Sequence, residues 1–162
     1  MFRLLFISLI FICSTISLQA QKLDYVLVGI NGLTCSQCSR SVEMQLRKLS
    51  FIKDIEMDLK ATVAKVYLHD NRNWDWYAFP KAVQDAGFSI RNLYLVFEEE
   101  LEGEKQCFTY KNTQFSRINK DNSKRFLLHN ISFMNKRDYK KENYARPKCA
   151  GQNDFMLIPH KK

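Results

Sequence analysis

The sequence predicts an α+β fold: a ferredoxin-like βαββαβ sandwich over residues 23–97, followed by a small β-rich C-terminal module. Two observations predict the sandwich. Short runs of alternating or β-branched apolar residues occur four times, and two segments between them space apolar residues as amphipathic helices do. Their order, strand–helix–strand–strand–helix–strand, is that of the split βαβ arrangement. A third observation, the acidic run over residues 98–104, marks the change to the second module.

Each strand of the sandwich follows from a local pattern. Residues 23–30 are rich in β-branched and aromatic side chains, and residues 52–59 and 62–68 alternate between apolar and polar side chains. The short connection between the last two runs suits an antiparallel hairpin. Residues 88–97 complete the sandwich as its fourth strand.

Two helices connect these strands. The first is expected from Ser36, its predicted N-cap, to about Leu49, because apolar residues recur there at i, i+4 and i+7. The second is expected over residues 79–86 and ends at Gly87, a residue type that favours the position after a helix C-cap. The aromatic stretch over residues 74–77, just before the second helix, is expected to serve packing.

The first twenty residues, 1–20, are typical of a signal peptide. Arg3 supplies a positive start, residues 4–12 form a nearly unbroken apolar run, and Ala20 is a small residue suited to cleavage. The apolar run is too short to span a bilayer, and no later stretch approaches the required length. We therefore expect an exported protein, periplasmic or secreted, with no transmembrane segment after cleavage.

Cleavage would leave two modules, residues 22–97 and 98–162. The net charge of the whole chain is +8, a balance that can accompany nucleic-acid binding. Export argues against a nucleic-acid partner, so we interpret the basic excess as a soluble surface or as an attraction to anionic membrane components. An exported chain also meets oxidising conditions, and disulfides must therefore be weighed at each cysteine pair.

The second module is expected to be a small sheet or a partly open barrel. Strand patterns cover residues 106–118, with an interruption near Lys111, and residues 125–133 and 155–158. Residues 139–144 are expected to form one helical turn.

The run GLTCSQC carries the clearest chemistry in the sequence. Its Cys35 and Cys38 offer two thiolates on one loop, and soft Cu(I) accepts two thiolates in a near-linear arrangement. The predicted helix begins beside them, so its N–H groups and dipole would lower the thiol pKa. A plain disulfide and a dithiol redox pair are the alternatives for the same two residues.

Three stretches carry a family resemblance. The runs GINGLTCSQCSRSVEMQLRKL, KDIEMDLKATVAKVYL and FPKAVQDAGFSI resemble the heavy-metal-associated domain of copper chaperones, copper-pump N-termini and mercury-scavenging periplasmic proteins. The match spans about seventy residues, and the glycines, the cysteine pair and the alternating hairpin are all in register. The resemblance implies a ferredoxin-like fold that binds Cu(I) or Hg(II) through Cys35 and Cys38.

The resemblance also implies roles for neighbouring residues. Leu33 stands where the family usually has Met, and it is expected to pack beneath the loop as an apolar plug. Thr34 is what copper and mercury members carry, whereas zinc- and cadmium-selective members tend to have an acidic residue there. Phe88 occupies a site-facing position that holds a lysine in many cytosolic chaperones, so Arg40 is the nearest candidate to supply that charge.

Cys107 and Cys149 lie near the two ends of the second module. In an oxidising compartment a structural disulfide is favoured, and it would stabilise so small a core by about 3–4 kcal/mol through loop closure. The alternative is a second soft-metal site built from Cys149, Met156 and His160, with or without Cys107, since these are suitable ligand types.

The expected function is an exported soft-metal-binding protein that holds Cu(I) between Cys35 and Cys38 and acts as a copper chaperone or scavenger. Three alternatives stay open: binding of Hg(II), a dithiol redox role, and a C-terminal module that docks a partner while the metal domain senses. No Ser/His/Asp set, phosphate-binding loop or carboxylate pair indicates catalysis, so an enzyme is not expected. The expected partners are the metal ion and a protein that donates or accepts it.

Overall fold

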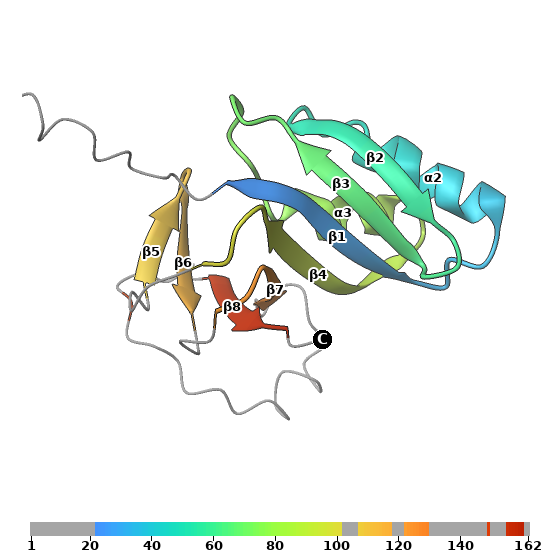
Figure 1. Ribbon diagram of the computed structural model, residues 1–162. Coiled ribbons are helices and arrows are strands. Elements are labelled where there is room, and N and C mark those ends of the chain that lie inside the picture. Colours follow the sequence, from blue (N-terminus) through green and yellow to red (C-terminus); the bar gives the residue numbers. More distant parts are fainter. Residues whose placement is uncertain (1–21, 102–106, 118–121, 130–148, 150–154, 161–162) are drawn as a thin grey trace, which may run out of the picture.

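The computed structural model describes residues 22–101, 107–117, 122–129, 149 and 155–160. Within them, eight strands form one sheet in the order β2-β3-β1-β4-β7-β8-β6-β5, and two helices accompany it (Figure 1). The elements are β1 (Leu23–Asn31), α2 (Ser36–Leu46), β2 (Ile52–Asp58), β3 (Val63–Leu68), α3 (Ala78–Asp85), β4 (Ser89–Phe97), β5 (Cys107–Tyr110), β6 (Thr113–Arg117), β7 (Arg125–His129) and β8 (Phe155–Pro159).

The first four strands and both helices have the predicted βαββαβ order. All neighbouring pairs among β2, β3, β1 and β4 are antiparallel, and β2 and β3 form the expected hairpin. Both helices cover the same face of this part of the sheet (Figure 1). Val42 and Leu46 of α2 and Phe79 and Val83 of α3 are fully buried against that face. The sequence periodicity therefore identified the core-facing side of the first helix.

The ends of the first helix differ from the prediction. Its N-cap is Cys35 and not Ser36, because the Cys35 Sγ atom accepts the hydrogen bond from a first-turn N–H. The helix ends at Leu46, earlier than predicted, and Leu49 lies in the following turn while still packing against the core. Gly87 follows the second helix with a φ of 87°, the left-handed conformation predicted for it.

The C-terminal strands do not form a separate small sheet or barrel, and that expectation was wrong. Strand β4 pairs with β7, β7 with β8, β8 with β6 in parallel, and β6 with β5, so the first sheet simply continues. In a βαββαβ unit β4 is an edge strand whose backbone groups are available for pairing, and β7 satisfies them. The division of the chain at residue 98 stays a prediction, and the helical turn expected at 139–144 lies outside the described residues.

Aromatic side chains join the two halves of the sheet. The ring of Trp76 stacks on Phe79 and meets Phe115 of β6 edge to face, with centroids 6.1 and 6.0 Å apart. The indole N–H of Trp76 donates to the hydroxyl of Thr113 at 3.0 Å in a buried site. The predicted packing role of this aromatic stretch is therefore confirmed for Trp76. Among the described residues, no helix is long and apolar enough to cross a membrane.

Candidate metal centre

The loop that carries the cysteine pair connects the end of β1 to the start of α2. Hydrogen bonds from the last two residues of β1 hold the start of this loop in place. The backbone N–H of Ile30 donates to the carbonyl of Thr62 at 3.0 Å, and the Asn31 side chain donates to the Ser89 hydroxyl at 3.2 Å. Gly32 then turns the chain with a φ of 79°, which favours glycine. The loop is thus anchored to the β2–β3 turn on one side and to β4 on the other.

Cys35 and Cys38 lie at the start of α2 and face each other. Cys35 has extended backbone angles, and its Sγ atom accepts a hydrogen bond from the Cys38 N–H at 3.1 Å. The Ser39 N–H donates to the carbonyl oxygen of Cys35 at 3.1 Å. The Cys35 side chain is exposed and that of Cys38 is half-buried, so an ion or a second thiol can reach the pair from solvent.

The structure contains the two cysteines as a disulfide, with their Cα atoms 5.2 Å apart. A soft metal would bind the reduced pair, in which two thiolates replace the S–S bond. A helix N-terminus stabilises negative charge within its first turn, so the observed placement favours the thiolate forms. The hydrogen bond that caps the helix would then become charge-assisted, which strengthens it.

The residues expected to support the loop lie beside it. Leu33 is only 1 % exposed and belongs to the hydrophobic core, the location expected of a plug under the loop. Thr34 is exposed next to Cys35. Phe88 is half-buried, and its ring lies 3.9 Å from where a Cβ atom on Gly32 would stand. Their roles in metal choice stay predictions.

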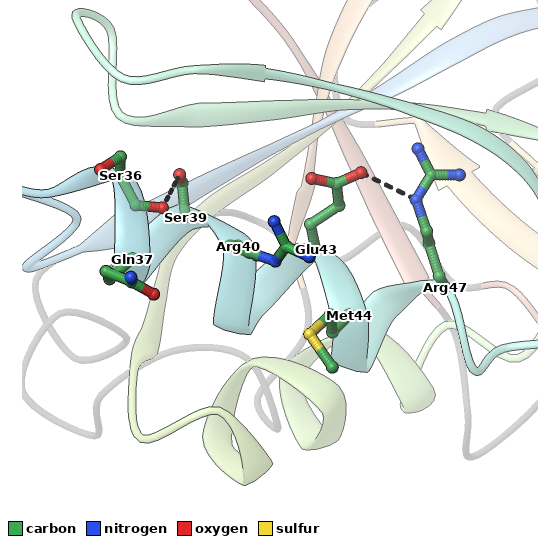
Figure 2. Close-up of a pocket in the computed structure, with 7 residues that line it drawn as sticks. All are labelled: Ser36, Gln37, Ser39, Arg40, Glu43, Met44 and Arg47. Atoms are coloured by element: carbon green, nitrogen blue, oxygen red, sulfur yellow. Dashed lines mark hydrogen bonds and ion pairs between the residues drawn. The ribbon is translucent and has the colours of Figure 1, made fainter.

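Arg40, the expected substitute for a site-facing lysine, lies on the outward side of α2. It lines an open hollow along the helix (Figure 2), whose walls are Ser36, Gln37, Ser39, Arg40, Glu43, Met44 and Arg47. Ser36 at one end of this hollow is the neighbour of Cys35. Arg40 thus lies on the exposed surface of α2 near the loop, and its contact with the sulfur atoms stays a prediction.

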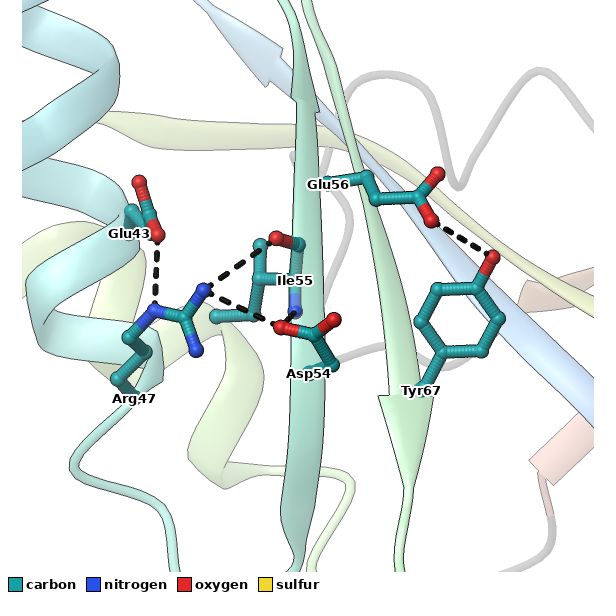
Figure 3. Close-up of polar contacts among 6 residues, drawn as sticks. All are labelled: Glu43, Arg47, Asp54, Ile55, Glu56 and Tyr67. Atoms are coloured by element: carbon teal, nitrogen blue, oxygen red, sulfur yellow. Dashed lines mark hydrogen bonds and ion pairs between the residues drawn. The ribbon is translucent and has the colours of Figure 1, made fainter.

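The charges at the other end of α2 have a structural role. The guanidinium of Arg47 donates to Glu43 at 2.8 Å and to Asp54 of β2 at 3.3 Å (Figure 3). These carboxylates raise the pKa of Arg47, the hydrogen bond to Glu43 being the main cause. The Ile55 N–H and then Arg47 lower the pKa of Asp54. This network ties the end of the helix to the sheet, away from the cysteines.

Of the four residues considered for a second soft-metal site, His160 does not join the other three. Cys107 and Cys149 are joined as a disulfide with Cα atoms 5.9 Å apart, the pairing that the sequence favours. Met156 and His160 are four residues apart in the extended β8 segment, roughly 13 Å along the chain. The His160 ring packs instead on Tyr94, with centroids 4.9 Å apart. Among the described residues, no three His, Cys, Asp or Glu side chains converge to hold a metal.

Sequence reasoning missed two features of this region. One is the capping role of Cys35, where Ser36 was the predicted N-cap. The other is the burial of His129, which is 1 % exposed and lies opposite Met156 in the β7–β8 pair. Strand pairing between distant segments places His129 and Met156 together, and no local sequence pattern predicts this pairing.

No protein-family model matches the chain, and no curated protein sequence matches it. Several solved structures do. Oxidised MerP from Ralstonia metallidurans is 24% identical, and the match covers 43% of this chain and 97% of MerP with a TM-score of 0.37. A copper-binding domain from HMA7, a P-type ATPase, is 27% identical, with 44% and 93% covered and a TM-score of 0.36.

The yeast copper transporter domain Ccc2a, solved in apo and Cu(I)-loaded states, is 24% identical, with 41% of this chain and 90% of the domain covered and a TM-score of 0.36. Over this part of its length the chain is similar to these two copper-binding domains and to MerP.

Proposed function

We propose that this chain is an exported soft-metal-binding protein that holds Cu(I) between the thiolates of Cys35 and Cys38 and acts as a copper chaperone or scavenger. The observation that carries the proposal is the placement of both cysteines in the first turn of α2, with Cys35 Sγ accepting the Cys38 N–H at 3.1 Å. A pair so placed offers two sulfur ligands to one ion, and it leaves the ion open to attack by a partner's thiol.

The chemistry of the site favours a soft ion with a low coordination number. Thiolates select Cu(I) and similar soft metals, whereas a hard cation needs oxygen ligands that this loop does not provide. Thr34 beside Cys35 supplies no carboxylate, which agrees with copper over zinc. Mercuric ion has the same preference for two thiolates, so Hg(II) binding is the alternative cargo.

A titration tests this proposal directly. The Cys107→Ser/Cys149→Ser protein, reduced under anaerobic conditions, leaves Cys35 and Cys38 as its thiol pair. Cu(I) added against a chromophoric chelator should fill one tight site in this protein. The further change Cys35→Ser or Cys38→Ser should abolish that site, and retention of tight binding in both would refute the assignment. A parallel titration with Hg(II), and metal analysis of the protein from its native compartment, would decide between the two ions.

A dithiol redox role is the second candidate, and the observed Cys35–Cys38 disulfide favours it. Pairs separated by two residues are typically reducible, and their reduction potential decides whether they exchange with other thiols. Under our proposal the disulfide is the resting, metal-free form, and the reduced protein does not reduce insulin disulfides. Insulin reduction at a rate comparable to thioredoxin would favour the redox role instead.

The proposal further includes export and the absence of enzymatic activity. Its support for export is the charge and apolar pattern of residues 1–20. Mass spectrometry of the protein isolated from cells should give the mass of a chain that starts after Ala20. An intact N-terminus in the cytoplasmic fraction would contradict export.

A further inference from the structure

Strand pairing at the C-terminal end of the sheet places four chemically distinctive residues in one row. Cys107 of β5 lies opposite Ser116 of β6, Ser116 beside Met156 of β8, and Met156 opposite His129 of β7. Residues that pair across neighbouring strands point to the same face of a sheet. The row therefore lies on one face, and Cys149 is bonded to Cys107 at its end.

The row faces away from the aromatic core, and three of its four residues are nevertheless shielded from water, while Cys107 at its end is half-buried. The next residues along these strands, Phe115 and Leu157, point to the core side. On the row itself, Met156 is 8 % exposed, and Ser116 and His129 are more deeply buried. Side chains on a face that points away from the core are ordinarily solvated. The burial of Ser116, Met156 and His129 therefore provides low-polarity surroundings on one side of the half-buried Cys107, in which thiolate and thioether ligands can hold a soft ion.

The spacing of the row suits one ion between its sulfur atoms. Neighbouring strands lie about 4.8 Å apart, so Cys107 and Met156, two strands apart, have roughly 10 Å between their Cα atoms. Ser116 stands between them with a small side chain, and no bulky group of the row separates the two. The Met156 side chain is long and unbranched, and it can turn toward the cysteines. His129 borders Met156 on the far side.

We propose that Cys107, Cys149 and Met156 form a second soft-metal site that opens when their disulfide is reduced. A dithiol reductant breaks the Cys107–Cys149 bond by transferring two electrons and two protons, and it leaves as its own disulfide. Cu(I) then displaces the two thiol protons to solvent and takes two thiolates and the thioether as ligands, a donor set that selects Cu(I). This site uses none of the atoms of the Cys35–Cys38 pair.

The test uses the full mature chain with the first pair removed. The Cys35→Ser/Cys38→Ser protein is reduced anaerobically with a dithiol, desalted, and titrated with Cu(I) against a chromophoric chelator. It should bind one equivalent after reduction and none before. Met156→Leu in this background, which keeps the side-chain volume, should weaken binding by about tenfold or more, since even outer-shell partners of metal ligands act on that scale. Met44→Leu, an exposed thioether on α2, is the matched control and should change nothing.

Three results would overturn the proposal. They are the absence of Cu(I) binding after reduction, unchanged affinity in Met156→Leu, and loss of the β-sheet circular dichroism signal on reduction, since the row requires its strands in register. X-ray absorption of the loaded protein should show three sulfur ligands, and only two would argue against Met156. Because the first site is tested in the Cys107→Ser/Cys149→Ser protein, each of the two metal sites can fail without the other.

Discussion

The Sγ atom of Cys35 accepts a hydrogen bond from the N–H of Cys38 at 3.1 Å, so one cysteine of the pair caps the helix whose first turn holds the other. Under our proposal the Cys35 side chain also binds the metal ion, which links metal binding to helix stability. The N–H that the sulfur satisfies is one of the four that every helix leaves unpaired at its start. Substitutions at Cys35 should therefore affect folding in a way that depends on the replacement.

Serine and alanine at position 35 should separate helix capping from metal binding. In a Cys38→Ala background, which removes the disulfide, Cys35→Ser keeps an oxygen that can cap the helix, whereas Cys35→Ala does not. We expect the alanine variant to be less stable by about 1 kcal/mol. Urea unfolding of the two double variants measures the difference. Equal stability of the two variants would show that the side-chain cap contributes nothing to folding. Neither variant should bind Cu(I) tightly, because both lack the two thiols.

The stability of the protein should depend on the size of the buried side chain at position 33, under the loop, and not on whether it is an aliphatic or a thioether group. Leu33 is fully enclosed by the core, so Leu33→Ala should cost about 2–5 kcal/mol through lost contacts and the cavity left behind. Leu33→Met conserves volume and should cost less than about 1.5 kcal/mol. Leu59→Ala, at a side chain 43 % exposed, is the control and should be nearly neutral. Thermal unfolding compares all three, and a mild effect of Leu33→Ala would contradict the plug.

The buried hydrogen bond between Trp76 and Thr113 should couple the two halves of the sheet. Thr113→Val keeps the shape of the side chain but leaves the indole N–H without its acceptor, which typically costs about 1–3 kcal/mol. Thr109→Val, at an exposed position of the adjacent strand β5, should have little effect. Because the core is shared, we expect a single unfolding transition by tryptophan fluorescence and by circular dichroism. Two separate transitions would show that the halves fold independently.

The parts of the fold that follow from local patterns were predictable from the sequence. The alternation in β2 and β3, the periodicity of α2 and the left-handed Gly87 are properties of neighbouring residues, and each is found where it was predicted. The two thiols of the candidate site were equally accessible to sequence reasoning, because the loop and the helix start fix their proximity.

The features that were missed depend on contacts between distant segments. Nothing local to Arg125 or Phe126 indicates that β7 pairs with β4, nor that β6 and β8 run parallel. His160 and Met156 were grouped because they are suitable ligand types, yet an extended strand separates them by about 13 Å. The residue beside Met156 is instead His129, brought there by the antiparallel pairing of β7 and β8.

Gly29 of β1 should be required for full stability, because the side chain of Asn92 on β4 occupies the space that a larger residue would need. Gly29 pairs with Asn92, and a Cβ atom at Gly29 would overlap the amide of Asn92. Gly29→Ala should therefore destabilise the protein by about 1–3 kcal/mol, as overpacking does. Adding Asn92→Ala should recover most of the loss, because it removes the group that the new methyl meets. A double-mutant cycle from urea unfolding gives the coupling, and additive effects would contradict the clash.

A tyrosine hydroxyl that joins β5 to β1 should give the protein a measurable alkaline sensitivity. The Tyr110 hydroxyl accepts a hydrogen bond from the Leu23 N–H at 3.1 Å, and burial raises its pKa above the ordinary value of 10.0. A raised folded-state pKa means that the unfolded chain loses its proton first, so the stability that Tyr110 contributes is complete below pH 10 and is lost as the pH rises above it. Tyr110→Phe should cost about 1 kcal/mol at pH 7 through the lost hydrogen bond. The difference in unfolding free energy between the two proteins should then narrow as the pH rises above 10, in urea unfolding at matched ionic strength, because phenylalanine does not titrate. A difference that stays constant over this range would mean that the hydroxyl is as easily ionised in the folded protein as in the unfolded chain.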